Sequence, residues 1–340
     1  MSEPYPKPIV DFLKGEPTPE QWTAISWPLE PSVVVAGAGS GKTSVMAARV
    51  IYLAMVATGA WPAEHEGGMP GNVLCLTFTN KATENLILKM RRALRTLDLD
   101  EGEEPEISNY HAFAAQVLER HGMLIGLEPG QRVLSQAQRA QIAARVLDRM
   151  TFETLHTRWQ PAIVGYILGL DEQLQNHLVE PETVVEHVEG KLDALRKARS
   201  AEPLLAAEER VEIARAVRVF RDIKAELGVI DFGDQIAHAV RIASEFPDVG
   251  RAYRDRFGAV LLDEYQDTNH AQAVLMRAVF GAGHPVTAVG DPDQNIYAWR
   301  GASLWNLLHF RKEFPLSDGS ESAQLPLYTN FRSGARILAE

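Results

Sequence analysis

A glycine-rich segment near residue 40 constrains this sequence more than any other feature. It stands between the apolar run Ser32 to Ala36 and a helical pattern over Ser44 to Ala57, and it reads Ala36-Gly37-Ala38-Gly39-Ser40-Gly41-Lys42-Thr43. Between a strand and a helix, such a loop surrounds phosphate oxygens with backbone N–H groups, and the helix N-terminus adds a positive dipole. The sequence therefore predicts a nucleotide-binding P-loop in which Lys42 reaches the outer phosphates and Thr43 holds magnesium. Ala36 stands where the usual pattern has its first glycine.

Further apolar, β-branched runs indicate the sheet that carries this loop. They cover Val73 to Phe78, Ala259 to Leu262, Pro285 to Val289 and Leu325 to Thr329. A second helical pattern over Ala82 to Leu97 follows the second run, as the crossovers of a parallel sheet require. We therefore expect an α/β fold with buried parallel strands.

The character of the sequence changes between residues 114 and 228. Ala, Leu, Gln, Glu and Arg recur there at helical spacing, without a convincing strand. Strands resume after this region and the P-loop precedes it, so we interpret it as an all-helical insertion in one P-loop domain. The expected division is residues 1–113 and 229–325 for the P-loop domain, 114–228 for the insertion, and 326–340 for the start of another domain. An independent helical domain is the alternative.

Composition describes an ordinary globular chain and excludes several classes of protein. Of the 340 residues, 46% are hydrophobic and 23% are charged. Cys75 is the only cysteine, which excludes a disulfide framework and fits a reducing cytoplasm. Neither a signal peptide nor an apolar run of about 18 residues occurs, so we expect no membrane insertion. A net charge of −11 argues against a broad basic surface that coats nucleic acid, but not against a local groove for one strand.

Two acids end the run over Ala259 to Leu262 and provide the second half of a nucleotide site. At this position Asp263 would bind magnesium, and Glu264 would orient or deprotonate the attacking water. An acid pair alone is weak evidence, because acids that end a strand are often solvated caps. Gln294 follows the next apolar run, and we expect it to reach the terminal phosphate from the same edge of the sheet.

Aromatic side chains follow Gln294 closely. Tyr297 and Trp299, with Arg300 beside them, are the residue types that stack on unpaired bases. Their proximity to a phosphate contact suggests coupling between nucleotide state and base stacking. The alternative is that both rings only pack under a loop.

These segments, in their order, resemble the superfamily 1 DNA helicases of the UvrD, Rep and PcrA type. Thr18-Pro19-Glu20-Gln21 is similar to the Q motif, which implies that Gln21 recognises adenine. Thr77 to Ala82 resembles motif Ia, and Tyr110 to Phe113 resembles motif Ib. By this likeness DNA contacts are implied for five residues: Phe78, Thr79, Asn80, Tyr110 and His111.

The later segments strengthen the resemblance. Asp263-Glu264-Tyr265-Gln266-Asp267-Thr268-Asn269 is similar to the extended Walker B motif, and Gly290 to Ala302 resembles motif III. Asn330-Phe331-Arg332-Ser333 resembles motif IV, which implies adenine stacking by Phe331, where Tyr is common, and a phosphate contact from Arg332. Asp231-Phe232-Gly233-Asp234 is a weaker match to a short element before Walker B.

The resemblance implies a RecA-like domain 1A with a helical 1B insertion, truncated at the start of a second RecA-like domain. The implied activity is that of an ATP-dependent 3′ to 5′ DNA helicase of the repair or recombination type, which uses ATP and magnesium on single-stranded DNA and its junctions with duplex. The second domain would supply an arginine that can contribute a factor of about 10³ to 10⁵ in rate, so we expect feeble hydrolysis without it. A partner chain or downstream segment could complete the site.

Two other functions stay open at this point. The chain could be a non-catalytic DNA-binding or interaction module, or a truncated paralogue that needs a partner chain. A P-loop ATPase unrelated to DNA is the second alternative, although it leaves Tyr297 and Trp299 without an explanation.

Overall fold

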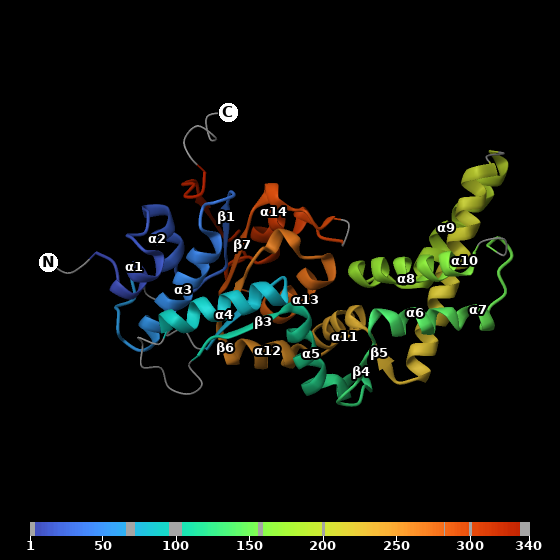
Figure 1. Cartoon of the computed structure of the whole chain (residues 1–340), viewed down its shortest axis with the longest axis horizontal. Helices are drawn as coiled ribbons and strands as arrows, with labels where there is room; N and C mark the ends of the chain where they lie inside the picture. The colour runs from blue at the N-terminus through green and yellow to red at the C-terminus, as the bar shows by residue number, and fades with distance from the viewer. Residues whose placement is uncertain are drawn as a thin grey trace. The chain divides into compact units, whose positions relative to one another are not determined.

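The chain divides into two compact units, which Figure 1 shows in a computed structural model. The structure describes residues 4–65, 72–94, 104–155, 159–198, 201–281, 283–298 and 301–333. The first unit combines Met1–Phe113 with Ala243–Glu340, and the second is Ala114–Ile242. The second unit thus extends beyond residue 228, where the sequence-based division ended the helical insertion.

A six-stranded parallel sheet forms the centre of the first unit, which confirms the predicted α/β class. Its strands are β1 (Ser32–Ala36), β2 (Asn72–Thr77), β3 (Glu106–Asn109), β6 (Phe257–Leu262), β7 (Val286–Gly290) and β8 (Ala323–Leu327). The order across the sheet is β3-β2-β6-β7-β1-β8. Five strands coincide with the apolar runs, whereas the edge strand β3, with the sequence EISN, has no such run and was not predicted.

Helices cover both faces of this sheet (Figure 1). Alternate side chains of each strand point to opposite faces, so apolar side chains on both faces are buried under helices. Val34, Cys75 and Leu261 share one core with the helices α1 to α4. The opposite face is contacted by α12 and α14. The helices of this unit are α1 (Lys7–Leu13), α2 (Pro19–Ser26), α3 (Lys42–Ala57), α4 (Asn80–Leu94), α12 (Pro247–Arg256), α13 (His270–Phe280) and α14 (Leu304–Glu313), with 3₁₀ turns η2 (Tyr265–Asp267) and η3 (Pro292–Gln294). Two elements, α5 (Tyr110–His121) and α11 (Phe232–Glu245), cross the division between the units.

The strand order determines which loops can meet. In a parallel sheet every strand ends at the same edge, and ligands of open α/β sheets bind outside these carboxyl ends. Strand β7 lies between β1 and β6, so the segments that follow these three strands are neighbours. On its other side β1 pairs with β8, which brings the segment after Leu327 beside the P-loop.

A buried arginine fixes the end of α2 against α3. The guanidinium of Arg49 donates hydrogen bonds to the carbonyls of Ala24, Ile25, Trp27 and Pro28 at 2.8 to 3.4 Å. These carbonyls lie at or just beyond the end of α2, where the helix leaves its acceptors without partners. Burial lowers the pKa of Arg49 to about 10, so the side chain stays charged at neutral pH.

The second unit is mainly helical, with one feature that the sequence did not indicate. Its helices are α6 (Gln136–Ala144), α7 (Val146–Arg149), α8 (Gln160–His177), α9 (Pro181–Lys197) and α10 (Ala201–Glu226), with the 3₁₀ turn η1 (Gly122–Ile125). Two strands of two residues, β4 (Arg132–Val133) and β5 (Val229–Ile230), pair in parallel. Within the described part of residues 114–228 only β4 departs from the predicted helical character, and a two-residue strand leaves no periodic pattern to detect.

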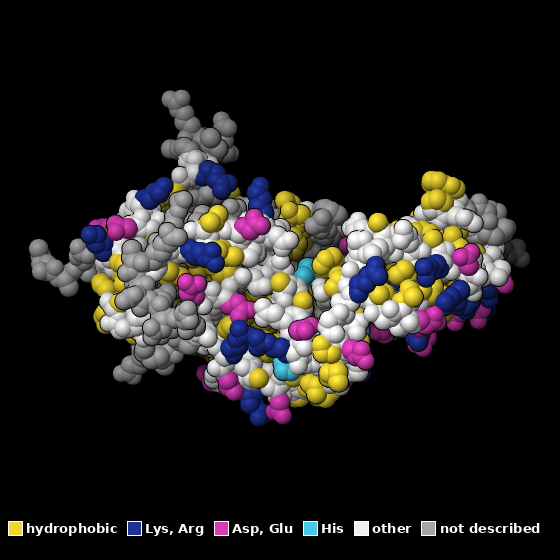
Figure 2. Space-filling view, turned by 60° about the horizontal axis from the view of Figure 1, so that its bottom comes forward, with side chains coloured by type: hydrophobic (Ala, Val, Ile, Leu, Met, Phe, Trp, Pro, Cys, Tyr) yellow, Lys and Arg dark blue, Asp and Glu magenta, His cyan; other side chains and the backbone are white. Residues whose placement is uncertain are grey.

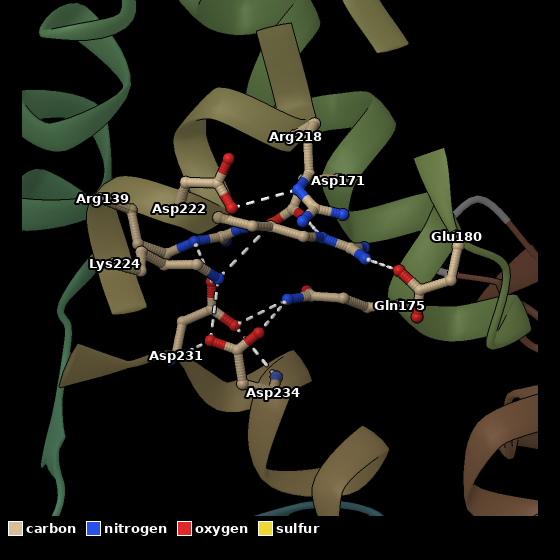
Figure 3. Close-up of polar contacts among 10 residues, drawn as sticks. Arg139, Asp171, Gln175, Glu180, Arg218, Asp222, Lys224, Asp231 and Asp234 are labelled. Carbon is tan, nitrogen blue, oxygen red and sulfur yellow. Dashed lines mark hydrogen bonds and ion pairs between the residues drawn. The ribbon is translucent and has the colours of Figure 1, made fainter. Parts of the chain in front are cut away.

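Buried charges hold this second unit together (Figure 3). The ammonium of Lys224 lies 2.8 Å from Asp231 Oδ2 and 2.7 Å from Asp234 Oδ2, and the Lys224 side chain is 3% exposed. Arg139 and Arg221 bind Asp171 at 3.3 and 2.8 Å. The cluster joins α6, α8 and α10 to the start of α11.

The segment Asp231 to Asp234 begins α11 with a reciprocal cap. Asp231 N donates to Asp234 Oδ2 at 2.8 Å, and Asp234 N donates to Asp231 Oδ1 at 3.1 Å. Such a capping box satisfies two N–H groups that the first helical turn leaves without partners. Gly233 lies so close to Gln175 that a Cβ at this position would clash with the amide of Gln175. This short segment therefore has a structural role.

The surface carries mixed charge. On the face drawn in Figure 2, Lys and Arg side chains lie in small groups with Asp and Glu between them. Among the described residues, no helix combines the length and the apolar character needed to cross a membrane.

Candidate nucleotide-binding site

The P-loop after β1 has the backbone of a phosphate-binding turn. Gly39 and Gly41 have φ values of 79° and 83°, a left-handed conformation that glycine adopts without steric cost. Gly41 is the N-cap of α3, and the Ser40 hydroxyl closes the turn by donating to Gly37 O at 2.7 Å. The loop therefore leads into a helix of 16 residues whose positive end faces the site.

Lys42 is buried and already has an anionic partner. Its ammonium lies 3.0 Å from Asp291 Oδ2 and 3.3 Å from Ala36 O, and the residue is 8% exposed. Asp291 follows β7, so this ion pair joins the segments after two adjacent strands. A nucleotide phosphate would compete with Asp291 for the ammonium.

The acid pair after β6 adopts an unusual backbone. Glu264 has a φ of 49°, a left-handed conformation that costs a non-glycine residue free energy. Asp263 stays buried at 3% exposure, and its N–H donates to Leu76 O of β2 at 2.8 Å. Because the chain turns at Glu264, the two consecutive carboxylates lie in different surroundings. Asp263 is buried, and Glu264 faces the cleft described below.

Gln266 connects this turn to the segment after β7. Its Nε2 donates to Glu264 Oε2 at 2.9 Å, and its Oε1 accepts from Asp291 N at 3.0 Å. Asp291 Oδ2 in turn accepts from Gln294 Nε2 at 2.7 Å. Glu264, Gln294 and Lys42 are thus joined through two residues, Gln266 and Asp291, whose roles the sequence did not indicate.

A cleft at this edge collects most of the predicted nucleotide contacts. It is lined by Gly37, Gly39, Ser40, Gly41, Lys42, Thr43, Ser44, Glu264, Gln294 and Arg332. Ala36 and Ala38 flank these residues on the P-loop. The structure therefore brings a general-base candidate, a phosphate-contact candidate and the P-loop lysine to one cleft.

Asp267 is a further acid near the cleft. Burial, and then the neighbouring charge of Glu264, raise the pKa of Asp267 to about 6 despite an opposing effect of Lys42. Within the described part of the chain, its Oδ1 has no hydrogen-bond partner. Asp267, Glu264 and Lys42 therefore lie near enough to influence one another's charge.

Gln21 lies against the P-loop but also caps a helix. Its Oε1 accepts from Thr18 N at 3.1 Å, and its Nε2 is 3.5 Å from Ser40 O. The side chain is therefore positioned beside the P-loop by the capping box that begins α2. Recognition of adenine by Gln21 stays a prediction.

The motif IV segment lies directly beside the P-loop. Phe331 N donates to Gly39 O at 2.9 Å, and the Phe331 residue is 60% exposed. An exposed ring at this place is available for stacking, as the resemblance implies. Arg332 lines the cleft.

Two of the predicted DNA contacts meet at the same edge of the sheet. The rings of Phe78, after β2, and Tyr297, after β7, have centroids 5.1 Å apart with an interplanar angle of 35°. Thr79 and Asn80 beside them are exposed. Trp299 and Arg300 lie outside the described residues, so the structure adds nothing to their predicted contacts.

The structure places Tyr110, a predicted motif Ib contact, in the core. Tyr110 is 1% exposed, and burial together with the nearby Tyr265 and Asp263 raises its pKa well above the usual value. The ring belongs to the core, and a DNA contact of Tyr110 stays a prediction. His111, the next residue, is half-buried in the first turn of α5, and a DNA contact there stays a prediction.

Thr43 and Asp263 are the predicted magnesium ligands. No cluster of three or more His, Cys, Asp and Glu side chains suited to a metal occurs in the ranges that the structure describes. Thr43 in the cleft and Asp263 at the end of β6 supply a hydroxyl and a carboxylate, the oxygen donors that Mg²⁺ accepts alongside phosphates and waters. This donor set fits a magnesium ion carried by a nucleotide.

Fold and cleft together define a P-loop protein with a RecA-like parallel sheet. A sequence-family model described as the UvrD/REP helicase N-terminal domain matches residues 17–315. The chain belongs to this family.

Similar proteins include named helicases. The chain is 30% identical to the ATP-dependent DNA helicase UvrD1 of Mycobacterium leprae over 345 residues, which cover 98% of this chain and 40% of that protein. It is 31% identical to UvrD1 of Mycobacterium tuberculosis over 344 residues. It is 29% identical to the ATP-dependent DNA helicase PcrA of Leuconostoc citreum, over 97% of this chain and 39% of the relative. The chain thus spans about 40% of the length of these relatives.

Proposed function

We propose that this chain is the ATP- and single-stranded-DNA-binding motor portion of an ATP-dependent 3′ to 5′ DNA helicase. The observation that carries the proposal is the cleft in which Lys42, Glu264 and Gln294 lie together. The Phe78 and Tyr297 rings at the same sheet edge add a surface for bases. Relatives named as ATP-dependent DNA helicases support this assignment.

In the proposed reaction each side chain has a defined task. Lys42 leaves Asp291 and binds the outer phosphates, where its charge offsets the charge that develops during phosphoryl transfer. Glu264, held by Gln266, orients or deprotonates the attacking water. Gln294 binds the terminal phosphate from the segment that also carries Tyr297.

Thr43 and Asp263 would hold the magnesium ion, which supplies electrostatic stabilisation of the phosphates. A second RecA-like domain, from the same polypeptide or from a partner chain, would add the phosphate-contacting arginine. The exposed Phe331 ring and the greater length of the relatives support that part of the proposal. We further propose that the helicase acts at junctions between single-stranded and duplex DNA, in the cytoplasm.

Strand binding can be tested with the chain itself. Fluorescence anisotropy with a labelled poly-dT oligonucleotide should show weaker binding for Phe78→Leu with Tyr297→Leu, since base stacking contributes about 1 to 3 kcal/mol per base. Tyr5→Leu is the matched control, because its ring contacts Trp22 on α2 and not the Phe78 pair. Equal affinity of the double variant and the control would refute the stacking surface.

A further inference from the structure

The segment after β8 contacts the tip of the P-loop through its own backbone and one side chain. Asn330 Nδ2 donates to Ala38 O at 2.7 Å, and Phe331 N donates to Gly39 O at 2.9 Å. Two successive carbonyls of the P-loop are therefore held by two successive residues of another segment.

Asn330 is held in place from its other side. Its Oδ1 accepts hydrogen bonds from Arg332 N and Ser333 N, both at 2.8 Å. Because its carbonyl end is fixed in this turn, its amide end is directed at Ala38 without further loss of side-chain freedom. The same turn places Arg332 at the cleft.

Gly39 permits this close approach. A Cβ at Gly39 would lie 2.7 Å from Asn330 Oδ1 and 2.8 Å from Arg332 Cβ. The positive φ of 79° would add backbone strain for any other residue. Glycine is thus needed here for contact with the Asn330 segment as well as for the shape of the P-loop.

The contact also fixes a donor. In a planar trans peptide the N–H points opposite to the C=O of the same unit. When Asn330 fixes the Ala38 carbonyl, it therefore fixes the direction of the Gly39 N–H. In a P-loop, backbone N–H groups donate hydrogen bonds to the phosphate oxygens.

We propose that Asn330 is a positioning residue that clips the tip of the P-loop and couples phosphate binding to the segment that carries Phe331 and Arg332. This inference rests on the proposed nucleotide binding. Coupling of two sites is reciprocal, so a ligand that orders the P-loop must also order residues 329–333.

Hydrogen exchange measured by mass spectrometry on the 340-residue chain tests the clip directly. The variant Asn330→Ser keeps an oxygen for the local turn but cannot reach Ala38, and Asn330→Ala loses both contacts. Without nucleotide, both variants should exchange faster than wild type over residues 37–41, with an unchanged melting temperature. The control is Tyr328→Ala, which alters an 82% exposed side chain of the same segment.

Nucleotide binding supplies the second readout. Titration with a fluorescent ADP and magnesium should show about three- to ten-fold weaker binding for Asn330→Ser, as expected for one lost hydrogen bond. Nucleotide should slow exchange over residues 329–333 in wild type, and less so in Asn330→Ser. Unchanged exchange at residues 37–41 in both variants would overturn the clip. A wild-type chain that binds no nucleotide would instead refute the proposed function, and the exchange without nucleotide would still decide whether Asn330 holds the loop.

Discussion

Replacement of Lys224 by Met should destabilise the second unit strongly. The Lys224 side chain is 3% exposed, and its ammonium lies 2.8 and 2.7 Å from Asp231 and Asp234. Methionine fills similar space but removes the ammonium from between the Asp231 and Asp234 carboxylates. Removal of one partner from a buried ion pair costs about 3 to 5 kcal/mol. Since Arg139 still binds Asp231 at 3.0 Å, we expect about 3 kcal/mol.

Urea denaturation, followed by hydrogen exchange in peptides of the second unit, measures this loss. For a typical urea dependence of about 1 to 3 kcal/mol per molar, the midpoint should fall by about 1 to 3 M. The matched control is Arg218→Met on the same helix, because Arg218 is 56% exposed and pairs with Glu182 and Asp222 at the surface. Exposed pairs contribute about 0 to 1 kcal/mol. Equal midpoints for the Lys224 and Arg218 variants would refute this reasoning.

The acid response gives an independent check on the same cluster. Burial alone would raise the pKa of Asp231, but Lys224 and Arg139 outweigh it and hold the pKa at about 2. An acid with a lowered folded pKa contributes stability that is present above its unfolded value, near 3.8, and is lost as the pH falls toward 2. In Lys224→Met the pKa of Asp231 should rise, so that this loss begins at a higher pH.

Three other changes have outcomes that follow from single contacts. Gly233→Ala should cost about 1 to 3 kcal/mol in urea unfolding, because its methyl group would clash with Gln175; Gly190→Ala, with open space around the site, is the control. Glu212→Ala should cost about 3 kcal/mol, because its carboxylate accepts three backbone N–H groups at 2.6 to 2.9 Å, and Glu212→Gln should cost less. Burial, with Arg254 nearby, lowers the pKa of His284 to about 4 despite a hydrogen bond with the Phe257 backbone. Because the folded chain holds His284 neutral, the protein loses stability as the pH falls from about 6.5 to about 4. His284→Gln should therefore make the melting temperature less dependent on pH over this window. An unchanged pH dependence would contradict this assignment.

The sheet was predictable because its central strands are buried on both faces. Val33 to Val35 and Val260 to Leu262 therefore read as apolar runs, each followed by turn or acidic residues. The edge strand β3 needs no such run, and the strands β4 and β5 have only two residues each. Long-range pairing forms these strands, and local sequence carries little of that information.

The sequence was sufficient to predict which residues lie together at one edge of the sheet. A parallel sheet brings Lys42, Glu264 and Gln294 to one side whatever their separation in sequence. Which groups bind one another depends on side-chain geometry, so the roles of Gln266 and Asp291 appeared only in the structure. A motif match likewise does not indicate on which side of a helix a ring lies, and the burial of the Tyr110 ring appeared only in the structure.

Calorimetric titration of the folded 340-residue chain with ADP and magnesium measures whether the P-loop and the acid pair hold one magnesium nucleotide. We expect one binding site that is weakened by Lys42→Ala and by removal of magnesium, with a smaller magnesium dependence in Asp263→Asn. Wild-type binding that is absent, or that is unchanged by Lys42→Ala, would contradict this expectation.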